Sequence, residues 1–172
     1  MITISVSDYN QFSQDYYDSV INSLQLHRLK CSCGHSACLS VHAYYCRSVF
    51  LPDSILSLRV CRVRCSECGR THALLLSSIV PFCRISLSRQ VMVVQAFEDC
   101  ASLSPLYDDD MFDENNVKSV ILRYRRFWRE RLRSEKIPLV PLPDLVLSCF
   151  AIYSMQFMQI HRGTNILFAG TT

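Results

Sequence analysis

The chain has 172 residues, of which 49% are hydrophobic, and a formal net charge of only +3. This apolar content excludes an intrinsically disordered protein, and the length suits one compact core or a small metal module joined to a helical domain. Because the net charge is small, it does not by itself indicate a polyanionic partner, so any such argument depends on how the charge is distributed.

Ten cysteines allow either a disulfide framework or metal ligation. The first residues, MITISVSDYNQF, have no basic start followed by an apolar run, so we expect a cytoplasmic protein with reduced thiols. The longest apolar stretch, residues 145–160, is interrupted by polar side chains and is short for a bilayer span. We therefore expect a core helix there and no membrane association.

In chain order, residues 1–28 form the first expected unit. An alternating run at its start predicts a strand, and Ser7 or Asp8 is expected to cap a polar helix that reaches about Leu26. Residues 29–84 form the second unit, in which short β-type runs alternate with cysteine pairs, and LSLRVCRVRC is the clearest strand. This alternation is typical of a zinc ribbon.

Residues 85–137 are expected to be helical and to resemble a helix-turn-helix. Ser88 is a candidate N-cap for a helix ending near Ala101, and a second helix over residues 117–134 is capped by Asp113 or Asn116. Its aromatic side chains share the apolar face, so we expect them in the core and not stacked on bases.

The last expected unit covers residues 138–172. Three prolines make a stiff connection, Asp144 caps a final helix, and an apolar strand or docking segment follows Gly163. The fold class is therefore α+β, with a small zinc-ribbon β module packed against a mainly α-helical region that resembles a helix-turn-helix.

The cysteine spacing predicts a metal site. Cys65-Ser-Glu-Cys68-Gly has the form of a zinc knuckle, in which two thiolates reach one ion from a tight turn. Cys31-Ser-Cys33-Gly also ends in a Cys-Gly dipeptide, but its two cysteines are one residue closer together, which leaves the ligand set open. Cys38 could replace Cys31, and an imidazole of His35, His42 or His72 could join, since zinc accepts nitrogen and sulfur. Our first choice is the four cysteines 31, 33, 65 and 68.

Four protein ligands leave zinc no open position, so we expect a structural Zn²⁺ and no enzyme. The chain also lacks the His-x-Glu element of zinc deaminases. The remaining cysteines stand alone, and for each we expect a buried structural role. They are Cys46, Cys61, Cys83, Cys100 and Cys149.

Basic side chains gather in two stretches. Seven carboxylates and no Lys or Arg lie between Glu98 and Glu114, whereas residues 117–136 hold eight basic and two acidic residues, a local charge of +6. A second cluster lies on the expected ribbon. Arginines on a solvent face can bind phosphates and base edges, so we expect DNA contacts from both clusters, although a solvated surface would have the same composition. The candidates are Arg62, Arg64, Arg70, Lys118, Arg125, Arg126, Arg129 and Arg133.

The runs CSCGHSACLSVHAYYCRSV and LRVCRVRCSECGRTHALLLSSIVPF resemble an uncharacterised bacterial family of domains of unknown function, over about residues 31–82. The same layout is similar to the N-terminal zinc ribbon and helix-turn-helix of insertion-sequence transposases. The resemblance implies a ligand pool of five cysteines, 31, 33, 38, 65 and 68, with His72 as a ligand or near neighbour. It implies no activity, because the family has no settled role.

These observations predict a non-catalytic, zinc-binding DNA-binding protein that acts as an accessory or regulatory factor of a transposon or other mobile element. A transposase is then a candidate partner, and no small-molecule substrate is expected. The alternative is a zinc-stabilised adaptor that binds other proteins through the acidic segment, the basic helix and the last apolar helix.

Overall fold

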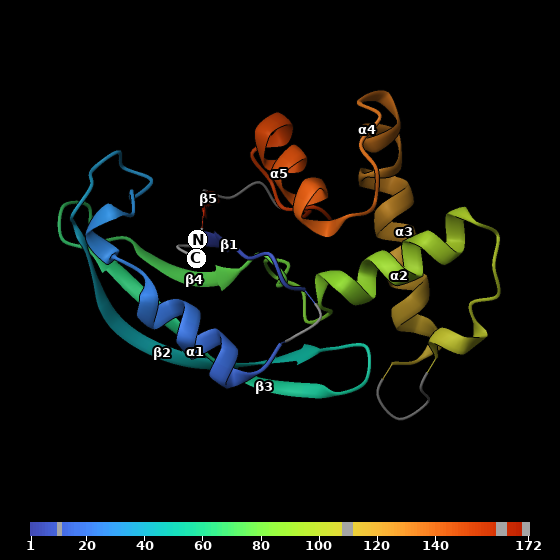
Figure 1. The fold of residues 1–172 in the computed structure, drawn as a ribbon, viewed down its shortest axis with the longest axis horizontal. Coiled ribbons are helices and arrows are strands. Elements are labelled where there is room, and N and C mark those ends of the chain that lie inside the picture. Colours follow the sequence, from blue (N-terminus) through green and yellow to red (C-terminus); the bar gives the residue numbers. More distant parts are fainter. Residues whose placement is uncertain (10–11, 108–111, 161–164, 170–172) are drawn as a thin grey trace.

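One five-stranded sheet organises the part of the chain that the computed structural model describes, residues 1–9, 12–107, 112–160 and 165–169. The strand order is β2-β3-β4-β1-β5; β2, β3 and β4 form an antiparallel meander, and β1 runs parallel to β4 and β5 (Figure 1). The strands are β1 (Ile2–Ser5), β2 (Leu39–Phe50), β3 (Ile55–Cys65), β4 (Thr71–Leu76) and β5 (Ile166–Ala169).

In these described residues five α-helices accompany the sheet, and the expected α+β class is confirmed. One of them, α1, lies along β2 and β3; α2, α3 and α4 lie at the end of the molecule opposite the cysteine loops, and α5 lies between them and β5 (Figure 1). The helices are α1 (Gln14–Ser23), α2 (Leu87–Glu98), α3 (Glu114–Phe127), α4 (Arg129–Ser134) and α5 (Leu142–Tyr153). Short 3-10 turns, η1 and η2, cover Leu26–Arg28 and Ser104–Leu106.

The helix boundaries correct several expectations. Ser13, and not Ser7 or Asp8, caps α1, because its hydroxyl accepts the N–H of Tyr16. Ser86, and not Ser88, caps α2 in the same way. Asp113 caps α3 as predicted, with its carboxylate 2.8 Å from the backbone nitrogen of Asn116. The single helix expected over residues 117–134 is interrupted at Trp128 and forms α3 and α4.

A side chain from α1 joins two strands where the sheet opens. β3 pairs with β4 only over Arg62–Arg64, so the N-terminal part of β3 has a free backbone edge. The hydroxyl of Tyr17 accepts the N–H of Cys61 at 2.9 Å and donates to the carbonyl of Leu74 at 2.9 Å. The hydroxyl of Tyr17 thus gives a hydrogen-bond partner to two buried backbone groups that the separating strands would otherwise leave unpaired.

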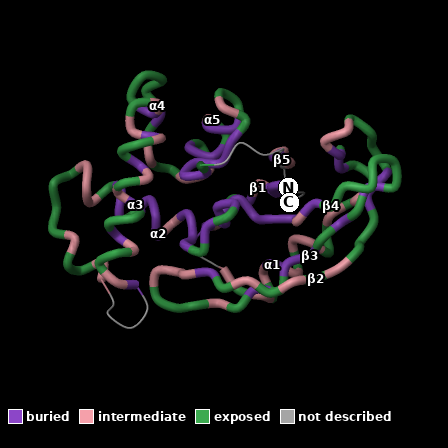
Figure 2. Tube along the Cα trace, turned by 180° about the vertical axis from the view of Figure 1, so that it is seen from behind, coloured by how far each residue is buried: buried purple, intermediate pink, exposed green. Residues whose placement is uncertain are grey.

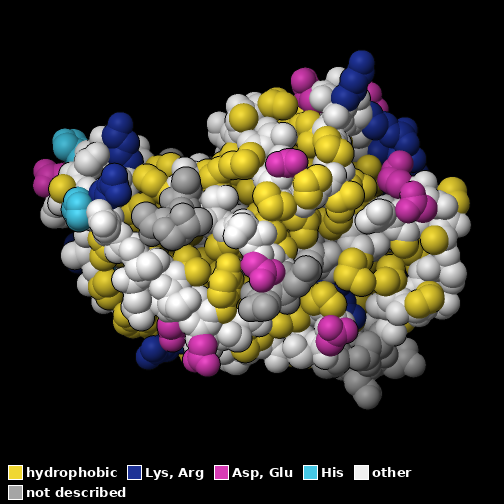
Figure 3. All heavy atoms as spheres, in the orientation of Figure 1, with side chains coloured by type: hydrophobic (Ala, Val, Ile, Leu, Met, Phe, Trp, Pro, Cys, Tyr) yellow, Lys and Arg dark blue, Asp and Glu magenta, His cyan; other side chains and the backbone are white. Residues whose placement is uncertain are grey.

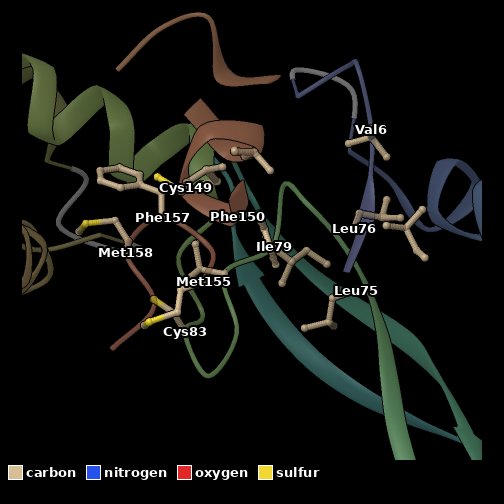
Figure 4. Close-up of a cluster of buried hydrophobic side chains, with 14 of the residues drawn as sticks. Val6, Leu75, Leu76, Ile79, Cys83, Cys149, Phe150, Met155, Phe157 and Met158 are labelled. Atoms are coloured by element: carbon tan, nitrogen blue, oxygen red, sulfur yellow. The ribbon is translucent and has the colours of Figure 1, made fainter. Parts of the chain in front are cut away.

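The core lies between the sheet and the C-terminal helices. Buried side chains of β4 and the turn after it, such as Leu76 and Ile79, face Phe150, Met155 and Phe157 (Figure 4). Buried stretches run through the middle of the molecule, whereas the outer loops are exposed (Figure 2). Trp128 is fully buried, with its ring 5.3 Å from that of Phe157, as its place on the apolar face predicted.

Buried polar side chains fix the C-terminal segment to the sheet. Thr3 donates its hydroxyl to Asn165 at 2.8 Å, and the amide of Asn165 donates to Gln159 at 2.9 Å. The indole N–H of Trp128 donates to the carbonyl of Gln159 at 3.1 Å. Because these groups are buried and cannot bond to water instead, the hydrogen bonds favour a single register of β5 against β1.

Two further expectations concern the whole chain. β1 and β5 come from the first and last expected units, 1–28 and 138–172, yet they join the same sheet as the expected ribbon; the four-unit division stays a prediction. Within the described residues, no helix is both long enough and apolar enough to cross a bilayer.

Candidate metal centre

The turn between β3 and β4 forms a knuckle. The backbone N–H groups of Cys68 and Glu67 point at the sulfur of Cys65, and the N–H of Arg70 points at that of Cys68. Gly69, at φ 69°, closes the turn, since its N–H donates to the carbonyl of Cys65 at 3.0 Å. The knuckle therefore presents two sulfurs on one side of the turn, as the sequence predicted.

The second pair lies in the loop between η1 and β2. Here the N–H of Gly34, at φ 94°, donates to the carbonyl of Cys31 at 2.9 Å. The N–H of Cys31 donates to the carbonyl of His35 at 3.0 Å, which folds the loop back on itself. The N–H of Cys33 is directed at the sulfur of Cys31. This loop is a shorter version of the knuckle.

The two loops bring four sulfurs together. The Sγ atoms of Cys31, Cys33, Cys65 and Cys68 all lie within 4.8 Å of one another, and the group could hold a metal ion. Cys31 is 3.6 Å from Cys68, and Cys33 is 3.8 Å from Cys65. A tetrahedral ion with metal–sulfur bonds of about 2.3 Å would place its ligands about 3.8 Å apart. The donor set fits such an ion without rearrangement of the loops.

The two thiols of the knuckle differ in acidity. Backbone N–H groups, first that of Cys68, lower the pKa of Cys65 to about 6, whereas, against the effect of the N–H of Arg70, burial and the neighbouring sulfurs raise the pKa of Cys68 to about 12. Because a metal ion is bound by the thiolate, Cys65 favours the bound form at neutral pH, and Cys68 loses its proton as the metal binds.

The alternate ligands lie beside the four sulfurs. Nε2 of His72, a buried residue, is 3.3 Å from the sulfur of Cys31, and burial lowers the pKa of this imidazole. In this place its N–H can support the thiolate, as outer partners of metal ligands do. The thiol of Cys38 donates to the carbonyl of His35 at 3.3 Å and contacts the sulfur of Cys65.

The lone cysteines are not all buried as we expected. Cys61, Cys83 and Cys149 are buried. Cys46 and Cys100 are exposed, which corrects the prediction: Cys46 lies on the edge strand β2, and Cys100 follows the end of α2.

Three of the predicted basic residues lie next to the metal centre, and we call Arg62, Arg64 and Arg70 the metal-end arginines. All three are exposed. Arg62 donates to the hydroxyl of Thr71 at 2.8 Å, and Arg70 lies 3.5 Å from that of Ser32. Among the described residues, no carboxylate forms an ion pair with them. Their guanidinium groups are therefore available to an external anion.

The strands around Arg62 and Arg64 keep this surface open. The residues opposite them on β2 and β4 are small, so they leave the two arginines uncovered. Arg62 faces Ala43 and Ala73, and Arg64 faces Ser40 and Thr71.

The basic helices α3 and α4 differ from this surface. Arg129 and Arg133 both bind Glu98 of α2, at 2.7 and 2.9 Å, and Lys118 pairs with Glu114 at 2.9 Å. Only Arg125 and Arg126 of the five helical candidates lie outside an ion pair within the described chain, and Arg126 packs over the ring of Phe127. The acidic residues Asp108, Asp109 and Asp110 lie outside the described residues.

The two basic clusters are also separated in space. Lys and Arg side chains gather over the cysteine loops and over α4, at opposite sides of a broad hydrophobic region (Figure 3).

A groove that the sequence did not indicate lies at the far end of the β2–β3 hairpin. Two adjoining cavities of about 360 and 500 Å³ share Pro52, Asp53 and Met92. Arg89 donates to the carbonyls of Leu51 and Pro52 and thereby fixes the hairpin turn to α2. No motif marks such residues, because a groove depends on tertiary packing.

Comparison with known proteins gives no relative: no family model, curated protein or solved structure matches the chain.

Proposed function

We propose that the chain is a non-catalytic zinc protein of the cytoplasm, in which Cys31, Cys33, Cys65 and Cys68 hold one structural Zn²⁺. The observation that carries this is the mutual approach of four sulfurs within 4.8 Å. Four thiolates in a tetrahedral arrangement select Zn²⁺ among the common divalent ions, and a closed ligand set leaves no position for a reacting water. Reduced thiols, which zinc requires, suit a cytoplasmic location.

Metal analysis of the purified chain tests the centre. We expect about one zinc per chain, and the double change Cys65→Ser with Cys68→Ser should abolish it. Cys46→Ser with Cys100→Ser is the matched control, since both residues are exposed and lie outside the cluster. Zinc-free wild-type protein, purified under reducing conditions with zinc supplied, would contradict the proposal.

We further propose that the metal-end arginines bind the phosphates of DNA. The metal fixes the two loops that frame this surface, and the arginines lack acidic partners among the described residues. Guanidinium groups held on a strand are suited to phosphate oxygens. The helices α2 and α3 keep their proposed role as a reading head like a helix-turn-helix, with Arg125 and Arg126 as the contacts that ion pairs leave available.

An electrophoretic shift with random duplex DNA and with the ends of a mobile element tests this function. Replacing Arg62, Arg64 and Arg70 by Gln should weaken binding on every sequence and lower the slope of log affinity against log salt by about 2 to 3. The double change Arg125→Gln with Arg126→Gln measures how much α3 contributes to the affinity for DNA. If no DNA binds at low salt, the function fails; binding preferred at element ends would support an accessory role in transposition.

The second candidate is a protein adaptor. It is favoured by exposed apolar side chains on and just before α5, Leu147, Ile152 and Val140, which are 47–49% exposed. Co-purification with a transposase, lost on Leu147→Ser with Ile152→Ser but kept in the metal-end arginine variant, would favour the adaptor.

A further inference from the structure

The two halves of the metal centre are unequal. In the knuckle, a spacing of three residues separates Cys65 from Cys68, and Gly69 follows; in the other loop, Cys33 comes only two residues after Cys31 and Gly34 follows. In both loops the first sulfur is buried, at 2% exposure for Cys31 and 1% for Cys65, and the second is nearer to solvent, since Cys33 is half-buried and Cys68 is exposed. The two halves therefore differ in the length of the loop and not in the order of burial.

A fifth sulfur, that of Cys38, lies beside the cluster near Cys65. Cys38 is 6% exposed, and its thiol contacts the sulfur of Cys65, the ligand that is also 3.8 Å from Cys33. The carbonyl of Cys38 accepts the N–H of Ser66 at 2.8 Å, which fastens this residue to the knuckle. Cys33 and Cys38 therefore approach Cys65 from the same loop.

The chain between them can supply the small movement that an exchange needs. Gly34 and Ala37 both have positive φ, 94° and 55°, so two turn residues already separate Cys33 from Cys38. Besides its contact with Cys65, the thiol of Cys38 makes a weak hydrogen bond to the carbonyl of His35, 3.3 Å away. Turning the Cys38 side chain toward the metal breaks this one bond and leaves the backbone contact to Ser66 in place.

We propose that Cys38 is a reserve ligand that exchanges with Cys33 for one coordination position, while Cys31, Cys65 and Cys68 remain bound. The inference rests on the proposed zinc centre. In the exchange, Cys38 releases its thiol proton to solvent as its sulfur binds, and the Cys33 thiolate takes up a proton as it leaves. The ion keeps four thiolates, so loss of the Cys33 sulfur to an alkylating agent does not remove the metal.

Cobalt substitution with chelator competition tests the exchange, because the thiolate-to-cobalt absorption reports the number of sulfur ligands. The variants are Cys33→Ser, Cys38→Ser, the double variant of both, and Cys31→Ser as the control for a ligand whose neighbour, His72, offers an imidazole and not a thiolate. We expect four thiolates and less than a tenfold loss of affinity in each of the first two. The double variant and Cys31→Ser should show three thiolates and at least about a 100-fold loss.

The outcomes separate the two proposals. If Cys33→Ser is as weak as the double variant, or binds cobalt through three thiolates, the reserve role is wrong and the zinc centre stands. If wild-type protein binds neither zinc nor cobalt, the centre itself is wrong. Mass spectrometry after limited iodoacetamide treatment of the zinc form adds an independent readout, since a chain alkylated only at Cys33 should retain its zinc.

Discussion

The side-chain amide of Gln14 makes two hydrogen bonds to the main chain of Arg59, accepting its N–H at 2.7 Å and donating to its carbonyl at 3.3 Å. A neighbouring strand would make the same pair of bonds, so α1 satisfies the edge of β3 where β4 has turned away to join β1. The contact explains how one sheet can serve both the cysteine loops and the C-terminal segment.

Tyr17, one turn further along α1, should be the more important of the two contacts. Tyr17→Phe leaves the N–H of Cys61 and the carbonyl of Leu74 unpaired in a buried gap, so we expect a loss of about 1–3 kcal/mol in the free energy of unfolding. Urea denaturation followed by circular dichroism measures it. Tyr16→Phe, at the next position toward solvent, should lose clearly less; equal losses would show that the bridge is unimportant.

Removal of the metal should disorder the cysteine loops and leave the helical end folded. In the absence of metal, mutual repulsion of thiolates would oppose the close approach of the sulfurs. Amide hydrogen exchange after chelation should therefore quicken at the N-terminal end of β2 and the C-terminal end of β3, while α3 and α5 stay protected. Uniform loss of protection would instead show that the whole chain unfolds with the metal.

The contact between Glu98 and the arginines of α4 should make stability depend on pH. Burial opposes ionisation of Glu98, but Arg129 and Arg133 hold the pKa of this carboxyl below its usual value. A lowered folded-state pKa contributes stability above the unfolded value, about 4.3, and this stability is lost as the pH falls through the folded value.

Glu98→Gln should therefore cost up to about 1 kcal/mol at pH 7, because the pair is partly exposed, and progressively less as the pH falls through the folded-state pKa of Glu98. Denaturant titrations of wild type and variant at a series of pH values measure this difference in the free energy of unfolding. Glu114→Gln, in the exposed pair with Lys118, is the matched control and should change stability less. A constant cost of Glu98→Gln at every pH would mean that the carboxylate charge is unimportant.

Trp128 should be among the most sensitive positions of the core. Trp128→Phe removes the indole hydrogen bond to the carbonyl of Gln159 and leaves a cavity beside Phe157, so we expect a loss of about 2 kcal/mol or more. Leu122→Ala, on α3 but 64% exposed, should change stability by no more than about 0.5 kcal/mol. Thermal unfolding by circular dichroism compares the two variants; similar losses would contradict the packing described here.

Local patterns predicted the elements that local chemistry determines. The knuckle at Cys65 and Cys68 was predictable because two cysteines three apart before a glycine have few other structural uses, and Asp113 because a capping side chain acts within one turn. The strand expected over residues 56–65 is β3, which begins one residue earlier.

What depended on distant contacts was not predictable. The parallel pairing of β1 with β4 and β5 joins segments more than 70 residues apart, and such short strands do not identify their partners from sequence. For the same reason, the sequence placed Arg129 and Arg133 on a free basic face, whereas the packing of α2 on α3 brings Glu98 to them. Charge patterns show which side chains are ionised, and only the fold shows which are neutralised.

The length of the β2–β3 hairpin has a mechanical consequence. Its strands contain 12 and 11 residues and so extend about 35–40 Å, from the cysteine loops at one end to the turn that Arg89 fastens to α2 at the other. The hairpin is therefore a spacer of fixed reach. The cysteine loops are thereby kept at a constant distance from the end of the hairpin that α2 holds.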